Sequence, residues 1–180
     1  MKGMEKLSEF FAKDLGAHFN EKKAYLSLFA RIGATVEDWI RGEILYLLSA
    51  SPELELLASN QAVPGVEGKP DLVVVHNNET LSLELKVLPK DRNYRYGWQR
   101  FCASPKNRID FERLQSRKRD AVIYVYWSDE NDWRRCKKHI LEEFDVDCVN
   151  EFKIPLEQGV AVFSLWRPAK DRLPPQTKIG

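Results

Sequence analysis

Asp71, Glu84 and Lys86 are the residues best suited to chemistry, because two acids and an amine at this spacing can share one face of a β-hairpin. Asn77 and Asn78 lie between them, and asparagine tolerates the left-handed backbone of a two-residue hairpin turn. If these asparagines form the turn, the register places Asp71 directly across from Glu84, with Cβ atoms about 4.5–5.5 Å apart. Lys86, two positions beyond Glu84, then lies on the same side of the sheet. A turn with an odd number of residues would move Glu84 to the other face.

Two carboxylates this close repel each other by roughly 3 kcal/mol at an effective dielectric near 20. A divalent cation would offset that repulsion, and Mg²⁺ takes one or two carboxylates together with waters and phosphate oxygens. Such an ion can activate a water and polarise a phosphodiester, while Lys86 would supply a fixed positive charge to the developing transition state. The other interpretation is structural: Asp71 caps the start of a strand after Pro70, and Glu84 and Lys86 lie on a solvated strand face.

Glu43 is a further candidate acid, because it falls within the apolar face of an expected helix. On a wheel at 100° per residue it lies in the middle of an arc formed by Val36, Trp39, Ile40, Tyr46 and Leu47. A buried carboxylate needs a cationic partner or a metal. We expect either a carboxylate delivered to the site from the helix before the sheet, or a structural glutamate paired with a buried arginine or lysine.

A basic stretch follows Lys86 directly in a chain whose net charge is only +1. Arg113 and Arg117 are spaced to share a helix face and to contact successive phosphates of a nucleic acid. Aromatic residues interleave with the earlier arginines, which suits stacking on unpaired bases. The alternative is that the aromatic side chains are core and the arginines are a solvated surface. The basic candidates for nucleic-acid contact are Arg92, Arg95, Arg100, Lys106, Arg108, Arg113 and Arg117, and the aromatic ones are Tyr94, Tyr96 and Trp98.

The elements that would position these residues form one domain over residues 1–180. We expect two N-terminal helices within 1–34, interrupted around Gly16, and a motif-bearing core over 36–127. The core begins with a helix capped at Thr35, continues with antiparallel strands over 54–62, 71–75 and 81–88, and has two helical pieces within 93–117. A strand over 121–127, a helix over 131–144, a strand over 160–166 and a loose tail over 168–180 complete the chain. The fold class is therefore α+β, with a mixed central sheet flanked by helices.

Composition excludes several other classes of protein. The three cysteines and three histidines are scattered and include no C-x-x-C pair, so we expect neither a disulfide framework nor a zinc site, as suits a reducing compartment. The chain has no apolar run long enough for a membrane span and no secretory signal, so we expect a cytoplasmic protein without a membrane partner. No small-molecule cofactor is expected.

Gly68-Lys69-Pro70-Asp71, Glu84-Leu85-Lys86 and the helical Glu43 together resemble the PD-(D/E)xK nuclease superfamily, especially its small VRR-NUC-type and Holliday-junction-resolvase-like members. The resemblance implies a restriction-endonuclease-like fold that binds Mg²⁺ or Mn²⁺ through Asp71, Glu84 and the carbonyl of Leu85. It also implies that Lys86 is catalytic, that Glu43 is the accessory acid of the helix, and that Gln99 matches a glutamine on the next helix.

The expected activity is hydrolysis of DNA phosphodiester bonds by a metal-activated water. Cutting both strands of a duplex would favour a homodimer. Two other functions stay open. One is a non-catalytic protein of the nuclease fold that binds nucleic acid or another subunit, and the other is a globular interaction protein in which the motif arises by chance.

Overall fold

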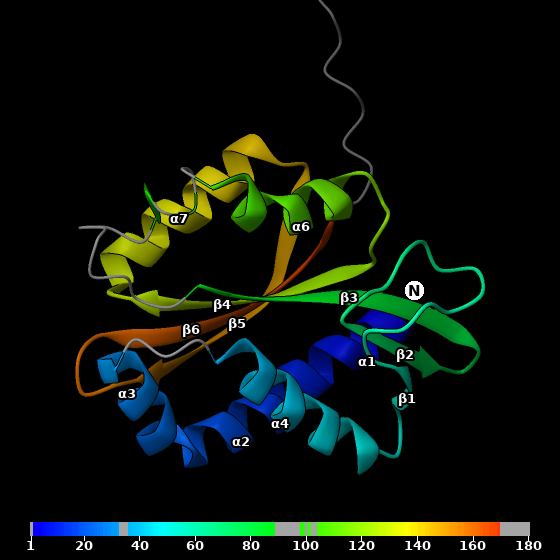
Figure 1. Ribbon diagram of the computed structural model, residues 1–180, viewed down its shortest axis with the longest axis horizontal. Coiled ribbons are helices and arrows are strands. Elements are labelled where there is room, and N and C mark those ends of the chain that lie inside the picture. The colour runs from blue at the N-terminus through cyan, green and yellow to red at the C-terminus, as the bar shows by residue number, and fades with distance from the viewer. Residues whose placement is uncertain (1, 33–35, 89–97, 100, 102–103, 170–180) are drawn as a thin grey trace, which may run out of the picture.

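The computed structural model describes residues 2–32, 36–88, 98–99, 101 and 104–169. Within these residues a mixed six-stranded sheet, in the order β1-β2-β3-β4-β6-β5, lies between two layers of helices (Figure 1). Helices α1 to α4 cover one face, and α6 and α7 cover the other. This arrangement confirms the predicted α+β class, the mixed sheet flanked by helices and the additional N-terminal helices.

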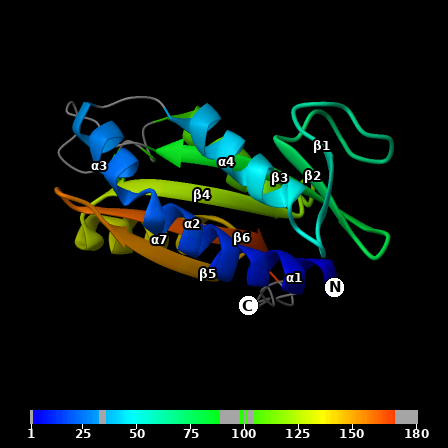
Figure 2. The ribbon, with the colours of Figure 1, turned by 90° about the horizontal axis from the view of Figure 1, so that it is seen from below.

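The N-terminal layer consists of α1 (Lys2–Phe10), a π-helical segment η1 (Phe11–Leu15), α2 (Gly16–Glu21), α3 (Lys23–Ile32) and α4 (Glu37–Ser49). The predicted break at Gly16 is wrong, because Gly16 has an ordinary right-handed helical backbone and the interruption falls at Lys22. Figure 2 shows these helices crossing one face of the sheet. Helix α4 contacts β1 and β3, whereas η1 and α2 contact β5. The expected cap at Thr35 lies outside the described residues.

Strands β1 (Glu55–Ala58), β2 (Leu72–His76) and β3 (Glu79–Leu88) form an antiparallel meander. The turn between β2 and β3 consists of Asn77 and Asn78, whose φ angles are 47° and 66°. His76 pairs with Glu79, and the ladder continues to Leu72 opposite Leu83. The two-residue turn and the register predicted from the sequence are therefore confirmed.

The second half of the chain contains α6 (Pro105–Gln115), β4 (Ala121–Ser128), α7 (Glu130–Glu143), β5 (Val146–Pro155) and β6 (Val160–Pro168). Strand β4 lies parallel to β3 and antiparallel to β6, and β5 closes the sheet as an edge strand beside β6. The sequence analysis did not predict β5. Its polar residues and mostly partial burial remove the strict alternation by which a half-buried strand is recognised. The loose tail predicted over 168–180 overlaps the end of β6, and residues 170–180 lie outside the described part of the chain.

The sheet separates two apolar cores. Leu81, Leu83, Leu85 and Val87 of β3 pack in the core beneath α1 to α4, whereas Leu88 packs in the core beneath α6 and α7. Because successive strand residues point to opposite faces, Glu84 and Lys86 lie on the α6 and α7 side. None of the helices in the described residues is both long enough and apolar enough to cross a membrane.

Candidate active site

The paired acids predicted from the hairpin lie where β2 begins. Asp71 directly precedes Leu72, the first residue of β2, and continuing the register by one position places it opposite Glu84. The backbone N–H of Leu85 donates to Asp71 Oδ2 over 2.8 Å. The side chains of Asp71 and Glu84 also interact directly. The structure thus brings together the two carboxylates, with Lys86 on the same side of β3.

The electrostatic state of Glu84 reflects this proximity. The residue is only 4% exposed, and burial raises the pKa of its carboxyl group to about 7, with a further upward contribution from Asp71 and a downward one from Arg119. A carboxyl group with such a pKa is protonated in about half of the molecules at neutral pH. The positive charge of the surrounding arginines therefore offsets only part of the cost of ionising Glu84.

Arginine side chains contact both acids. Arg119 Nε and Arg113 Nη1 donate to the same atom, Glu84 Oε1, over 2.6 and 3.1 Å. Arg41 Nη1 donates to Asp71 Oδ1 over 3.1 Å. Arg113 also reaches Asp110 Oδ1 at 3.4 Å. These arginines surround the acid pair from α4, from α6 and from the residue two before β4.

Lys86 and Glu37 lie at the open edge of β3. Beyond Asp71 the partner strand has ended, and the N–H of Val87 donates instead to Glu37 Oε2 over 3.1 Å. Lys86 Nζ lies 3.8 Å from the same oxygen. The N–H and C=O of one residue in an antiparallel strand point to the same edge, so the Leu85 carbonyl also faces this opening. Glu37, in the first turn of α4, is thus the helix acid that approaches Lys86.

Glu43 does not join this cluster. His18 Nε2 and Lys22 Nζ lie 2.6 and 3.1 Å from its carboxylate oxygens. Burial alone would raise the pKa of Glu43, but the hydrogen bonds from His18 and Lys22 outweigh it and the pKa is lowered. The structural alternative, a glutamate paired with basic groups, matches this environment. The sequence-based wheel was misplaced because it included Tyr46, which is 67% exposed.

Glu37 and Arg41 of α4 reach the site although neither was predicted from the sequence to belong to it. The buried residues of the helix are Ile40, Ile44 and Leu48. Glu37 and Arg41 are separated by one helical turn and therefore share a face. An acid and a base four residues apart at the start of the helix before the sheet were the sequence feature that could have identified Glu37 and Arg41 as site residues.

Asp110 is a further buried acid beside the site. It lies in the middle of α6, is 7% exposed and contacts Arg113. Burial raises the pKa of its carboxyl group to about 6, against downward contributions from Lys86 and then Arg113. No sequence pattern distinguished it, because its position depends on how α6 packs on the sheet.

The donor set fits a divalent ion held by few protein ligands. In the described residues, no group of three or more histidine, cysteine, aspartate or glutamate side chains is arranged to hold a metal. Two opposed carboxylates with a backbone carbonyl at the same edge correspond to the way proteins hold Mg²⁺, which retains several waters. Burial first, and then Asp71, raise the pKa of Glu84, and a nearby positive charge would stabilise its ionised form.

The residues predicted to contact nucleic acid lie in different environments, and some lie outside the described residues. Arg92, Arg95 and Arg100 lie outside the described residues, as do Tyr94 and Tyr96. Gln99 and Lys106 are exposed, whereas Trp98 packs against the core beneath α6 and α7. Arg108 pairs with Glu143 and lies over the ring of Phe144. That environment gives Arg108 a packing role between α6 and α7.

Arg113 and Arg117 do not share a helix face, contrary to the prediction. Helix α6 ends at Gln115. Arg117 follows with a left-handed φ of 59°, its N–H donates to Leu114 O, and the N–H of Lys118 donates to Arg113 O. This is the paired hydrogen-bond pattern that terminates helices. Arg113 therefore points into the site while Arg117 belongs to an exposed turn.

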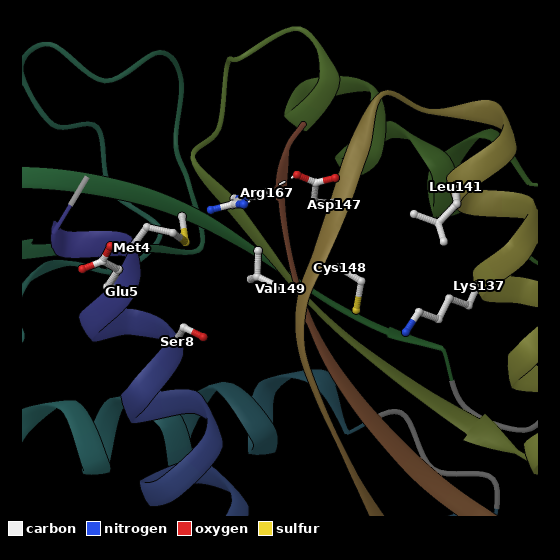
Figure 3. Close-up of a pocket in the computed structure, with 9 residues that line it drawn as sticks. All are labelled: Met4, Glu5, Ser8, Lys137, Leu141, Asp147, Cys148, Val149 and Arg167. Atoms are coloured by element: carbon white, nitrogen blue, oxygen red, sulfur yellow. Dashed lines mark ion pairs between the residues drawn. The ribbon is translucent and has the colours of Figure 1, made fainter. Parts of the chain in front are cut away.

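A hollow of about 710 Å³ lies elsewhere, at the edge of the sheet formed by β5 (Figure 3). Residues of α1 such as Met4 and Ser8 line one side, and Lys137 and Leu141 of α7 line the other. Three of its charged groups are already paired, Lys137 with Glu151 and Arg167 with Asp147. Neither Asp71 nor Glu84 borders this hollow.

No protein-family model, curated protein or solved structure matches the chain. The resemblance to the PD-(D/E)xK nucleases therefore rests on the motif residues of the sequence.

Proposed function

We propose that the protein is a divalent-metal-dependent nuclease that hydrolyses DNA phosphodiester bonds. The observation that carries the proposal is the opposition of Asp71 and Glu84 across the β2–β3 hairpin, with Lys86 on the same side of the sheet. Two acids converging beside a lysine at an open strand edge constitute a site for a metal ion and a phosphate.

Each residue has a role in this proposal. Asp71, Glu84 and the carbonyl of Leu85 would hold Mg²⁺ or Mn²⁺, which when bound would supply Lewis-acid polarisation of the phosphodiester and lower the pKa of the attacking water. Lys86 places a positive charge beside the reacting phosphate. Glu37 takes the accessory role that the resemblance assigned to Glu43, because it lies beside Lys86 and bonds the β3 edge.

DNA is the proposed partner, and it would approach from the α6 side of the sheet, where Glu84 and Arg113 meet. Lys106 and Gln99 are exposed in the described residues and are available to a polyanion. A homodimer would allow both strands of a duplex to be cut, since a twofold axis matches the symmetry of the duplex.

A specific observation favours a second function, which is nucleic-acid binding without catalysis. Arg41, Arg113 and Arg119 already donate to the proposed metal ligands. A protein that had lost catalysis could keep its paired acids as a structural ion network of this kind. The two functions differ in whether Mn²⁺ binds and whether DNA is cut.

The test is a cleavage assay on plasmid, single-stranded and branched DNA with Mg²⁺ or Mn²⁺. Wild type is compared with Glu84→Ala, Lys86→Met and, as a matched control, Glu43→Gln, which removes an acid outside the site. We expect wild type and Glu43→Gln to cut, and Glu84→Ala and Lys86→Met to lose at least about 100-fold in rate. Cleavage that survives Glu84→Ala, or no cleavage by wild type on any substrate, would contradict the proposal.

A further inference from the structure

Two arginines donate to one oxygen of Glu84, and their surroundings differ sharply. The side chain of Arg119 is 4% exposed, whereas that of Arg113 is 40% exposed. Both end at Glu84 Oε1. Their shared acceptor and unequal burial raise the question of what each cation does at a site where a metal would bind.

Arg119 is fixed in place by its other hydrogen bonds. Its Nη1 donates to the backbone carbonyls of Glu67 and Lys118, each over 2.7 Å. Glu67 belongs to the loop that leads into Asp71, and this loop turns over the guanidinium at Gly68, whose left-handed φ is 70°. The planar guanidinium of Arg119 thus joins Glu84 to the segment that carries Asp71. A lysine amine cannot reproduce this bridge, because it lacks the fixed planar arrangement of several N–H donors.

Arg113 is held much less firmly. It lies in the last turn of α6, where Glu84 and Asp110 are its side-chain partners over 3.1 and 3.4 Å. No backbone carbonyl accepts from it among the bonds found in the described residues. A half-exposed guanidinium bound only to carboxylates can move when a stronger cation takes one of them.

We propose that Arg119 is a positioning residue that aims Glu84 at Asp71, and that Arg113 is a displaceable counter-ion that leaves Glu84 for a substrate phosphate when a divalent cation binds. This inference rests on the proposed function, because it assumes that the acid pair holds a metal. Guanidinium matches a phosphate through two parallel hydrogen bonds, so Arg113 would contact the nucleic acid only in the metal-bound state.

Calorimetry with Mn²⁺ separates the two roles. Arg119→Lys keeps the positive charge but loses the planar set of N–H donors that holds Glu84 in position. Mn²⁺ affinity should therefore fall about tenfold or more, as it does when other residues that orient metal ligands are replaced. Arg113→Gln removes a competing cation, so Mn²⁺ affinity should rise about fivefold, and Arg113→Lys should stay near wild type. Arg108→Gln, on the same helix but paired with Glu143, is the control for loss of one charge and should leave the affinity unchanged.

The second measurement is DNA affinity by fluorescence anisotropy in a Lys86→Met background, which removes the proposed catalytic amine and keeps both carboxylates. With Mn²⁺, Arg113→Gln should weaken DNA binding. It should also reduce the slope of log affinity against log salt concentration by about one, as expected for the loss of one phosphate contact. In EDTA it should have no effect, because Arg113 is then held by Glu84. An equal loss with and without metal would overturn the displacement.

The remaining outcomes are distinguishable. If wild type cuts DNA but Arg119→Lys binds Mn²⁺ as tightly as wild type and Arg113→Gln binds it no more tightly, the inference fails and the nuclease proposal stands. If the predicted Mn²⁺ and DNA affinities are found but no substrate is cut, the inference stands and the nuclease proposal fails. If Mn²⁺ does not bind to wild type, both fail.

Discussion

Replacing Glu84 by glutamine should make the metal-free protein progressively more stable, relative to wild type, as the pH rises. Glu84 has its pKa raised from 4.5 to about 7 in the folded protein. Between these values the folded state binds a proton that the unfolded state has released, so wild type loses stability as pH increases through this window. Glutamine carries no such proton and mimics the neutral acid.

The expected size follows from the shift. Integrated between pH 5 and pH 8, a shift from 4.5 to about 7 corresponds to roughly 2–3 kcal/mol of unfolding free energy. Because Glu84 is almost fully buried, solvent screening does not reduce this figure substantially. Titrating groups that do not interact with Glu84 contribute equally to both proteins, so their contribution cancels in the difference between wild type and variant.

The assay is urea unfolding of wild type and Glu84→Gln at pH 5, 6, 7 and 8 in EDTA, with the difference in unfolding free energy plotted against pH. Glu9→Gln is the matched control. The hydrogen bond and the charge of Lys6 lower the pKa of Glu9, so this acid is ionised in both folded and unfolded states above about pH 5 and the difference for this variant should stay flat. A flat difference for Glu84→Gln as well would refute the conclusion that burial and Asp71 destabilise the Glu84 anion.

Three further outcomes follow from the same contacts. Asn78→Val should cost about 1–2 kcal/mol in urea unfolding, because a β-branched residue is placed at a φ of 66°, whereas Asn78→Gly should be neutral or stabilising. Glu37→Gln should reduce Mn²⁺ affinity and cleavage together, while Glu43→Gln should change neither. Mn²⁺ affinity of wild type, measured by calorimetry, should rise from pH 5 to about pH 7 and then level off, because the ion competes with the proton on Glu84.

The hairpin could be predicted from the sequence because its determinants are local. Two asparagines specified a turn with left-handed backbone, and period-two alternation specified the strand that follows. Register then followed arithmetically, so the position of Asp71 opposite Glu84 required no tertiary information. Local signals of the same kind also predicted the buried strand β4.

The surroundings of the acids could not be predicted because they depend on how distant elements pack. Whether Glu37 or Glu43 faces the sheet is decided by the rotation of α4, and an exposed Tyr46 shifted the predicted apolar arc. Arg119 lies far from Glu84 in sequence and meets it only because β4 pairs in parallel with β3. The polar edge strand β5 was missed for a related reason, since an edge strand exposes residues that alternation rules assign to loops.

The distribution of charge around the site explains how a pair of acids can persist in the fold. Glu84 receives both of its arginines on Oε1, and Asp71 receives Arg41 on Oδ1. The carboxylates are thus compensated from outside the pair, while burial first and the neighbouring Asp71 second keep the pKa of Glu84 high. In the proposed metal-bound state Arg41 and Arg119 would keep their carboxylates, whereas Arg113, whose side chain is 40% exposed and bound only to carboxylates, would leave Glu84.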